Sequence, residues 1–217
     1  MIIVGGLMPT NSTTDEADVA YSYDCDLGRW NTFSLPPKNY LNRQGAFATI
    51  VTDGVAYIWG GKRSRVQKFN NTVEQLPSSM YRLDSLYPAN STLLQSSSLS
   101  PPLRYSHTQT LVNQNVIVIL GGFDGSTGSP ISMQDIWTFN TLTHHWTQVM
   151  ATLDKENKPA NRSSHSEVLM SDGVSILIYG GYDGYHVFND VAVLDTRTWT
   201  WTVKNTNAAV QGRADVS

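Results

Sequence analysis

Pairs of adjacent glycines recur along the chain at nearly even spacing, beginning at positions 5, 60, 121 and 180. Each pair ends a short run rich in β-branched and aromatic residues, which is the composition of a strand. A pattern that returns about every 60 residues indicates structural repeats. The complete set of these glycines is Gly5, Gly6, Gly60, Gly61, Gly121, Gly122, Gly180 and Gly181.

The clearest repeat covers residues 162–202 and predicts four strands joined by tight turns. Its first two strands, at residues 164–170 and 174–179, flank Asp172-Gly173, a pair typical of a hairpin turn. The third and fourth strands follow at residues 191–194 and 198–202. Short strands with such connections form an antiparallel meander, so the sequence predicts an all-β fold.

The other repeats carry the same signals in the same order. Arg162 and Arg104 open the first strands of two repeats, and Arg43 opens the first strand of a third. Tryptophans occupy the fourth strands: Trp30, Trp146 and Trp201. A lone four-stranded sheet cannot bury both of its faces, so the repeats are expected to stack on one another, with these tryptophans packed between them.

Glycine pair, Asp-led third strand and fourth-strand tryptophan, in this order, resemble the kelch motif. The resemblance extends from Ile2 to Arg213. It implies a β-propeller of four-stranded antiparallel blades, one blade per repeat, in which the glycine pairs and tryptophans are structural. Kelch propellers commonly have about six or seven blades, so the chain is expected to be an incomplete piece of one.

The repeat sets the blade boundaries, and it leaves one alternative to an incomplete propeller. That alternative is a four-bladed ring, closed by pairing of residues 214–217 with residues 2–4. Under the kelch interpretation, Gly212-Arg213 repeats the start of a first strand. The expected blades are residues 1–40, which lack a first strand, the divergent residues 41–100, residues 101–157 and 158–210, and a further blade that begins in residues 211–217.

Composition narrows the classes of function. Charged residues make up 15% of the chain and the formal net charge is −3, which argues against a nucleic-acid partner. No apolar run approaches the roughly 18 residues of a membrane-spanning helix. Sequons and a Ser/Thr/Asn-rich composition favour an extracellular or cell-surface domain, with a cytoplasmic location as the alternative. The sequons begin at Asn11, Asn70, Asn90 and Asn161.

Partner binding is expected at the end of the blades where the glycine pairs lie. Because the first two strands of a blade are antiparallel, the first-strand arginines share that end with the loops that follow Gly-Gly. The predicted binding residues are Arg43, Arg104, Phe123, Asp124, Arg162, Tyr182 and Asp183. Arginine and tyrosine are frequent interface anchors, and the kelch resemblance implies a protein or peptide partner. The alternative is that these Arg and Asp residues pair between blades and are structural.

The sequence predicts no catalytic residue, no cofactor and no metal site. It contains no nucleophile elbow, zinc-protease helix or phosphate-binding loop motif. His107 and His165 recur at equivalent positions, which favours a structural role. Asp124-Gly125 and Asp183-Gly184 are turn-forming pairs first.

Two other functions remain open. The kelch resemblance also includes galactose-oxidase-like copper enzymes, which use two histidines, two tyrosines and a cysteine linked to a tyrosine. Cys25 is the only cysteine of this chain, and its surroundings do not map onto that site residue by residue. A carbohydrate-binding ectodomain is the other alternative, compatible with aromatic residues in the loops.

Overall fold

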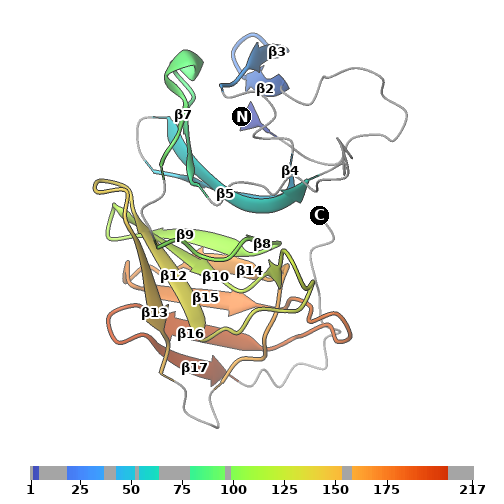
Figure 1. The fold of residues 1–217 in the computed structure, drawn as a ribbon, viewed down its shortest axis with the longest axis vertical. Helices are drawn as coiled ribbons and strands as arrows, with labels where there is room; N and C mark the ends of the chain where they lie inside the picture. The colour runs from blue at the N-terminus through green and yellow to red at the C-terminus, as the bar shows by residue number, and fades with distance from the viewer. Residues whose placement is uncertain are drawn as a thin grey trace. The chain divides into compact units, whose positions relative to one another are not determined.

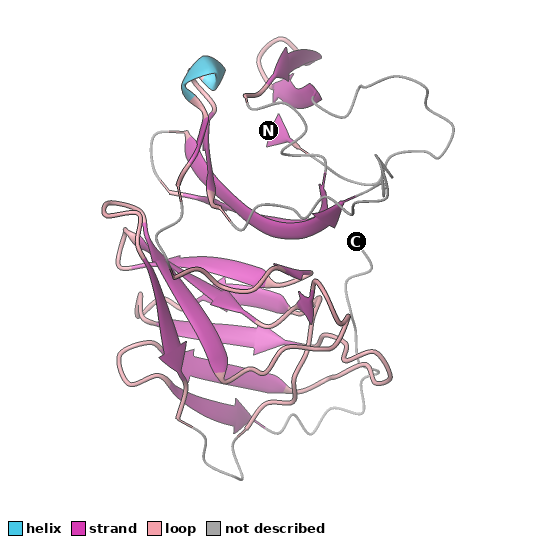
Figure 2. Cartoon of the chain, viewed as in Figure 1, coloured by secondary structure: helices cyan, strands magenta, loops and turns pink. Residues whose placement is uncertain are grey.

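The computed structural model describes residues 2–4, 19–36, 43–51, 54–63, 79–95, 99–152 and 158–204. These residues form antiparallel sheets and a 3₁₀ helix, η2 (Pro88–Asn90) (Figure 2). The predicted all-β fold is therefore confirmed. The chain divides into two compact units, Met1–Gln95 and Ser96–Ser217. Among the residues in the ranges above, no helix is long and apolar enough to cross a membrane.

The first unit contains a three-stranded and a four-stranded sheet (Figure 1). The first sheet has the order β1-β2-β3 and consists of β1 (Ile2–Ile3), β2 (Val19–Asp24) and β3 (Arg29–Ser34). The second sheet has the order β4-β5-β6-β7 and consists of β4 (Arg43–Ile50), β5 (Val55–Arg63), β6 (Tyr81–Asp84) and β7 (Thr92–Leu93).

One predicted strand end in this unit is wrong. The pattern ends the second strand of the divergent repeat at Gly60-Gly61, but β5 continues to Arg63 and pairs with Arg43. Gly61 allows the close pairing, because a Cβ there would lie 2.9 Å from the Cβ of Ala46. In the fourth strand of this sheet, Leu93 pairs with Tyr81 and packs against a cluster that contains this fully buried tyrosine.

The second unit holds two four-stranded sheets. Blade 3 has the order β13-β12-β10-β9, and blade 4 has the order β14-β15-β16-β17. A short ribbon, β8 (Arg104–Tyr105) with β11 (Phe123–Asp124), extends blade 3. The strands of blade 3 are β9 (Thr108–Val112), β10 (Val116–Leu120), β12 (Asp135–Asn140) and β13 (Trp146–Met150). Those of blade 4 are β14 (Ser166–Leu169), β15 (Ser175–Tyr179), β16 (Val191–Asp195) and β17 (Thr200–Lys204).

The hairpin predicted at Asp172-Gly173 joins β14 to β15. The Asp172 carboxylate accepts hydrogen bonds from the backbone N–H groups of Val174, at 3.0 Å, and Ser175, at 2.8 Å. Gly173 has a φ of +72°, a conformation that L side chains rarely adopt. Local turn chemistry therefore sets the register in which these two strands pair.

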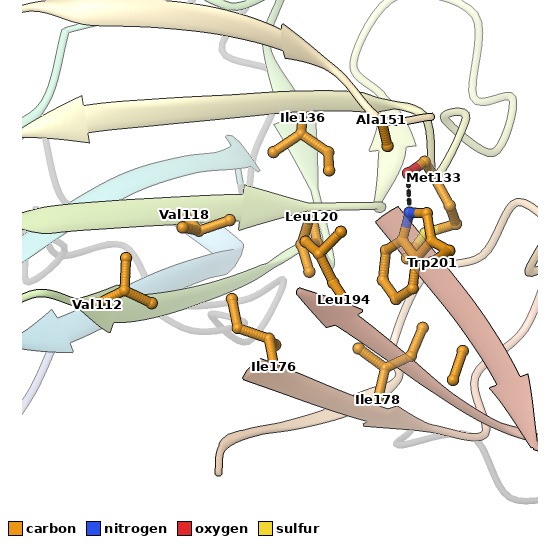
Figure 3. Packing of buried hydrophobic residues seen from close by; sticks show 11 residues of the cluster. Val112, Val118, Leu120, Met133, Ile136, Ala151, Ile176, Ile178, Leu194 and Trp201 are labelled. Atoms are coloured by element: carbon orange, nitrogen blue, oxygen red, sulfur yellow. Dashed lines mark hydrogen bonds between the residues drawn. The ribbon is translucent and has the colours of Figure 1, made fainter. Parts of the chain in front are cut away.

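Blades 3 and 4 pack face to face through a shared apolar core (Figure 3). Each strand alternates its side chains, so one row from every strand enters this core. Trp201 is 1% exposed, and its indole N–H donates to the backbone carbonyl of Met133 at 2.8 Å. Blade 3 contributes Val112, Val118, Leu120, Met133, Ile136 and Ala151, and blade 4 contributes Ile176, Ile178, Ala192, Leu194 and Trp201.

The prediction that the fourth-strand tryptophans pack between blades holds only in part. Trp201 lies between two blades as expected. Trp146 is buried and contacts the rings of Trp137 and Phe139 in its own blade. Trp30 differs, since it is 49% exposed and contacts Tyr23 of its own sheet at 5.1 Å between ring centroids.

The glycine pair of blade 3 permits a close approach of blade 4. A Cβ at Gly121 would lie 2.5 Å from the carbonyl oxygen of Arg162, and the backbone N–H of Gly122 donates to that same oxygen at 2.9 Å. Gly122 also lies against its own blade, where a Cβ would meet His107 at 2.8 Å. The pair thus serves two packing contacts, which explains why two adjacent glycines recur.

Candidate functional site

The arginine that opens blade 4 is a buried structural residue. Arg162 is 0% exposed. Its guanidinium group donates to both carboxylate oxygens of Asp190, at 2.6 and 2.8 Å, and to the carbonyl oxygen of Gly180 at 2.9 Å. The Phe188 ring lies 4.4 Å from the guanidinium carbon and covers the group. The ion pair therefore ties the first strand to the glycine pair and to the start of β16.

Blade 3 repeats this arrangement. Arg104 is also 0% exposed and donates to the Asp135 carboxylate at 3.0 Å and to the carbonyl oxygen of Gly121 at 3.3 Å. Burial lowers the pKa of Arg104, and the negative charge of Asp135 opposes that shift. Each Arg–Asp pair joins two residues of the same blade. The alternative that these pairs join neighbouring blades is therefore wrong.

The buried arginines fix the loops in which the other predicted residues lie. β8 pairs with β11, so Asp124 lies opposite Arg104 and Phe123 lies opposite Tyr105. In blade 4, Ser163 and Tyr182 form the corresponding bridge. The expectation that first-strand starts share one end of the blades with the loops after Gly-Gly is therefore confirmed in blades 3 and 4.

Aromatic rings form a row across this end of the two blades. The centroids of Tyr105 and Phe123 lie 5.5 Å apart, and Phe123 meets Tyr182 edge-on at 6.3 Å. All three side chains are half-buried. The row links the loop of blade 3 to the loop of blade 4 and offers large, rigid apolar area.

The two predicted aspartates act mainly within their own loops. Asp124 accepts hydrogen bonds from the Ser126 hydroxyl and from the N–H groups of Ser126 and Thr127, and these bonds lower its pKa to about 2. The N–H groups of His186 and Tyr185 lower the pKa of Asp183 to about 2 in the same way. Both are ionised turn formers, as the Asp-Gly pairs indicate.

Two exposed apolar side chains lie in the loop of blade 4. Tyr185 is 89% exposed and Val187 is 49% exposed. Sequence reasoning did not single out these two residues or Tyr105, although Tyr105 directly follows the marker arginine. It also did not identify Asp135 and Asp190 as the partners of the buried arginines. The Asp at the start of each third strand could have indicated these pairs.

The predicted binding residue Arg43 lies in β4 of the first unit, where its backbone faces Arg63.

A buried polar cluster joins the edge strands β9 and β14 of the two blades. Thr108 of β9 contacts the Nε2 atom of His165 at 2.8 Å, and its hydroxyl donates to the Glu167 carboxylate of β14. His107 is 2% exposed. Burial, with a further contribution from the charge of Arg104, lowers the pKa of His107 to about 3. Both histidines therefore sit in packed interiors, in agreement with the structural role expected for them.

The surroundings of Cys25 are those of an exposed turn. The carboxylate of Asp24 accepts hydrogen bonds from the N–H groups of Asp26 and Leu27, both at 3.0 Å, and closes the turn between β2 and β3. In the part of the chain that the structure describes, no three His, Cys, Asp or Glu side chains gather as ligands for a metal ion.

Repeated antiparallel blades, glycine pairs and buried Arg–Asp pairs are the features of kelch-type propeller blades. A family model described as the KLHDC2/KLHL20/DRC7 Kelch-repeats domain matches residues 1–216. The chain therefore belongs to the kelch-repeat family, and the resemblance seen in its sequence is confirmed.

Named relatives share modest identity with this chain. It is 26% identical to Kelch domain-containing protein 10 of Xenopus tropicalis over 93% of this chain and 46% of that protein. It is 28% identical to the Rho GTPase-activating protein gacHH of Dictyostelium discoideum, over 83% of this chain and 11% of that protein. It is 27% identical to the host cell factor homolog hcf-1 of Caenorhabditis elegans, over 74% of this chain and 21% of that protein. The chain thus spans less than half of each relative.

Proposed function

We propose that this chain is a non-catalytic scaffold that binds a protein or peptide through the loops at the glycine-pair end of its blades. Membership of the kelch-repeat family supports an interaction module as the general class. The observation that carries the proposal is the aromatic row of Tyr105, Phe123 and Tyr182, flanked by the exposed Tyr185. Interfaces of this kind favour rigid aromatic anchors.

In this proposal, the two buried arginines hold the binding loops in place and do not contact the partner. Arg104 and Arg162 have no exposed surface with which to touch a partner. Each holds the loop end of its blade through the carbonyl of a glycine pair and an Asp that is about a quarter exposed, at 25% for Asp135 and 28% for Asp190. Preorganised loops lose less conformational entropy on binding, so buried supports contribute to affinity without direct contact.

The test compares partner recovery by variants of exposed residues. Tyr185→Ser combined with Val187→Ser removes apolar area from the loop of blade 4 and leaves the buried core unchanged. Leu142→Ser is the matched control: Leu142 is 74% exposed and lies in the turn after β12, at the opposite end from Asp135. Quantitative pull-down should show recovery reduced at least tenfold for the double variant and retained for the control.

Equal recovery by the double variant and the wild type, with both proteins folded by circular dichroism, would exclude this loop as the binding surface. No contact within the described residues favours the copper-oxidase or the carbohydrate-binding alternative. The extracellular or cell-surface location stays a prediction from the sequence.

A further inference from the structure

The turn between β6 and β7 holds an exposed asparagine in a fixed backbone. Asn90 is the last residue of η2, the helix drawn in cyan in Figure 2, and it is exposed. Its backbone N–H donates to the carbonyl oxygen of Tyr87 at 2.8 Å, which makes residues 87–90 a tight turn. Asn90 also begins the sequon Asn90-Ser91-Thr92, in which the side-chain amide of the asparagine is the atom group that accepts an N-linked glycan.

The rest of this sequon has the exposure that a glycan acceptor needs. Thr92, whose hydroxyl completes the sequon, is exposed in β7, the edge strand of its sheet. Ser91 is 5% exposed, and its hydroxyl accepts a hydrogen bond from the N–H of Asp84 at 3.0 Å. The Asp84 carboxylate accepts from the N–H of Tyr87 at 2.9 Å. These bonds hold the turn with Ser91 inside and with Asn90 and Thr92 at the surface.

A large aromatic side chain stands exposed at the other end of the same turn. Tyr87 is 67% exposed. The two end residues of a tight turn have Cα atoms less than about 7 Å apart, so a sugar attached to Asn90 lies within reach of the Tyr87 ring. One face of a pyranose sugar presents C–H groups, whose partial positive charge matches the negative face of an aromatic ring. The turn therefore offers both an attachment atom and a surface for the attached sugar.

The other sequon in the described part of the chain lacks these features. Asn161 is half-buried, and its side-chain oxygen is buried. The two residues that follow it, Arg162 and Ser163, are 0% exposed. The Ser163 hydroxyl is already bound to the carbonyl oxygen of Tyr182 at 3.1 Å. A glycan at Asn161 would oppose this burial, whereas a glycan at Asn90 displaces nothing. The sequons at Asn11 and Asn70 begin outside the described residues.

We propose that Asn90 carries an N-linked glycan whose first sugar, an N-acetylglucosamine, packs on the ring of Tyr87. The glycan covers an exposed aromatic side chain. It also lies beside the edge strand β7, where a bulky polar group hinders pairing with a strand of another molecule. The modification requires passage of the protein through the secretory pathway. It does not depend on the proposed partner binding, whose residues lie in the second unit.

Peptide mass spectrometry of the full-length gene product from its source cells tests the attachment. The tryptic peptide of residues 83–104 contains Asn90 as its only asparagine. Enzymatic release of N-linked glycans in heavy-oxygen water converts an occupied Asn90 to labelled aspartate. Thr92→Val removes the sequon hydroxyl and should abolish the label, whereas the matched control Thr92→Ser keeps the hydroxyl and should retain it. An unlabelled Asn90 in the wild type, or a label that survives Thr92→Val, would overturn the proposal.

Hydrogen–deuterium exchange of the Asn90 amide tests the packing on Tyr87. This amide closes the turn, so its exchange rate reports local opening. The glycosylated wild type should exchange at least about threefold more slowly than unglycosylated Thr92→Val, an effect of the size of one aromatic contact. Tyr87→Ser should remove this slowing when the same two forms are compared. Leu86→Ser is the matched control, because Leu86 is 66% exposed in the same turn, and it should retain the slowing.

The two measurements separate attachment from packing. A labelled Asn90 with a glycan effect that depends on Tyr87 supports the whole proposal. A labelled Asn90 with the same slowing in wild type and Tyr87→Ser would overturn the contact between sugar and ring. Loss of the slowing in Leu86→Ser as well would overturn that contact too, because it would assign the effect to the turn as a whole.

Discussion

Replacement of Arg162 by methionine tests whether the marker arginine of a blade is structural. Arg162→Met keeps much of the side-chain volume but removes the donors that bind Asp190, Gly180 and the carbonyl of Ala160, the last at 3.0 Å. Breaking a buried ion pair from one side costs about 3–5 kcal/mol. The Asp190 side chain is 28% exposed and can be partly hydrated, so the expected loss of stability is about 3 kcal/mol.

Urea unfolding followed by tryptophan fluorescence measures this loss, which corresponds to a decrease of about 1 M or more in the midpoint. Arg197→Met is the matched control, because Arg197 forms an ion pair with Asp195 while its side chain is 67% exposed. Solvent screens that pair, so the control should leave the midpoint essentially unchanged. Equal midpoints for the two variants would refute the structural role of Arg162.

A double-mutant cycle adds a second check on the same pair. Asp190→Asn should destabilise the wild type by removing the counter-charge of a buried guanidinium group. In the Arg162→Met background the same change should cost much less, because the carboxylate has already lost its partner. Additive effects would show that the two side chains do not act together.

Two further predictions concern packing and pH. The pKa of His107 falls from 6.5 to about 3 in the folded chain, so only the unfolded state binds this proton as the pH drops between those values. Stability should therefore decrease over that range, by up to about 1.4 kcal/mol per pH unit, and His107→Gln should reduce the slope measured by urea titrations at several pH values; an unchanged slope would contradict this. Gly121→Ala should cost about 3 kcal/mol, because its Cβ would clash with Arg162. Gly173→Ala meets no atom within 4 Å and should cost only about 1 kcal/mol, and equal thermal shifts for the two variants would be the contrary result.

Much of the fold could be predicted from local pattern. The Asp172-Gly173 turn and the alternation along β14 and β15 are short-range features, and their strands lie within a few residues of the predicted positions. The strand end at Gly60-Gly61 was predicted wrongly, because a glycine pair permits close approach but does not by itself stop a strand. Pairing with β4 decided how far β5 continues.

The candidate site could be predicted less well. The sequence indicated which end of the blade carries Arg162 and Tyr182, since antiparallel pairing alone decides that. It did not indicate that Arg162 is 0% exposed or that Tyr185 is 89% exposed. Arginine is a common interface residue and a common buried ion-pair partner, and residue type does not separate the two roles.

The sequence by itself determined the repeat, the strand order within each blade and the positions of the glycine pairs, because these depend on residues close together in the chain. Tertiary structure alone decided the inward pairing of Arg104 with Asp135, the contact of Phe123 with Tyr182, and the exposure of Val168. Each of these depends on how much of a side chain's surroundings is filled by segments distant in sequence. Burial is a property of that packing, and a strand pattern states which face is apolar without stating what covers it.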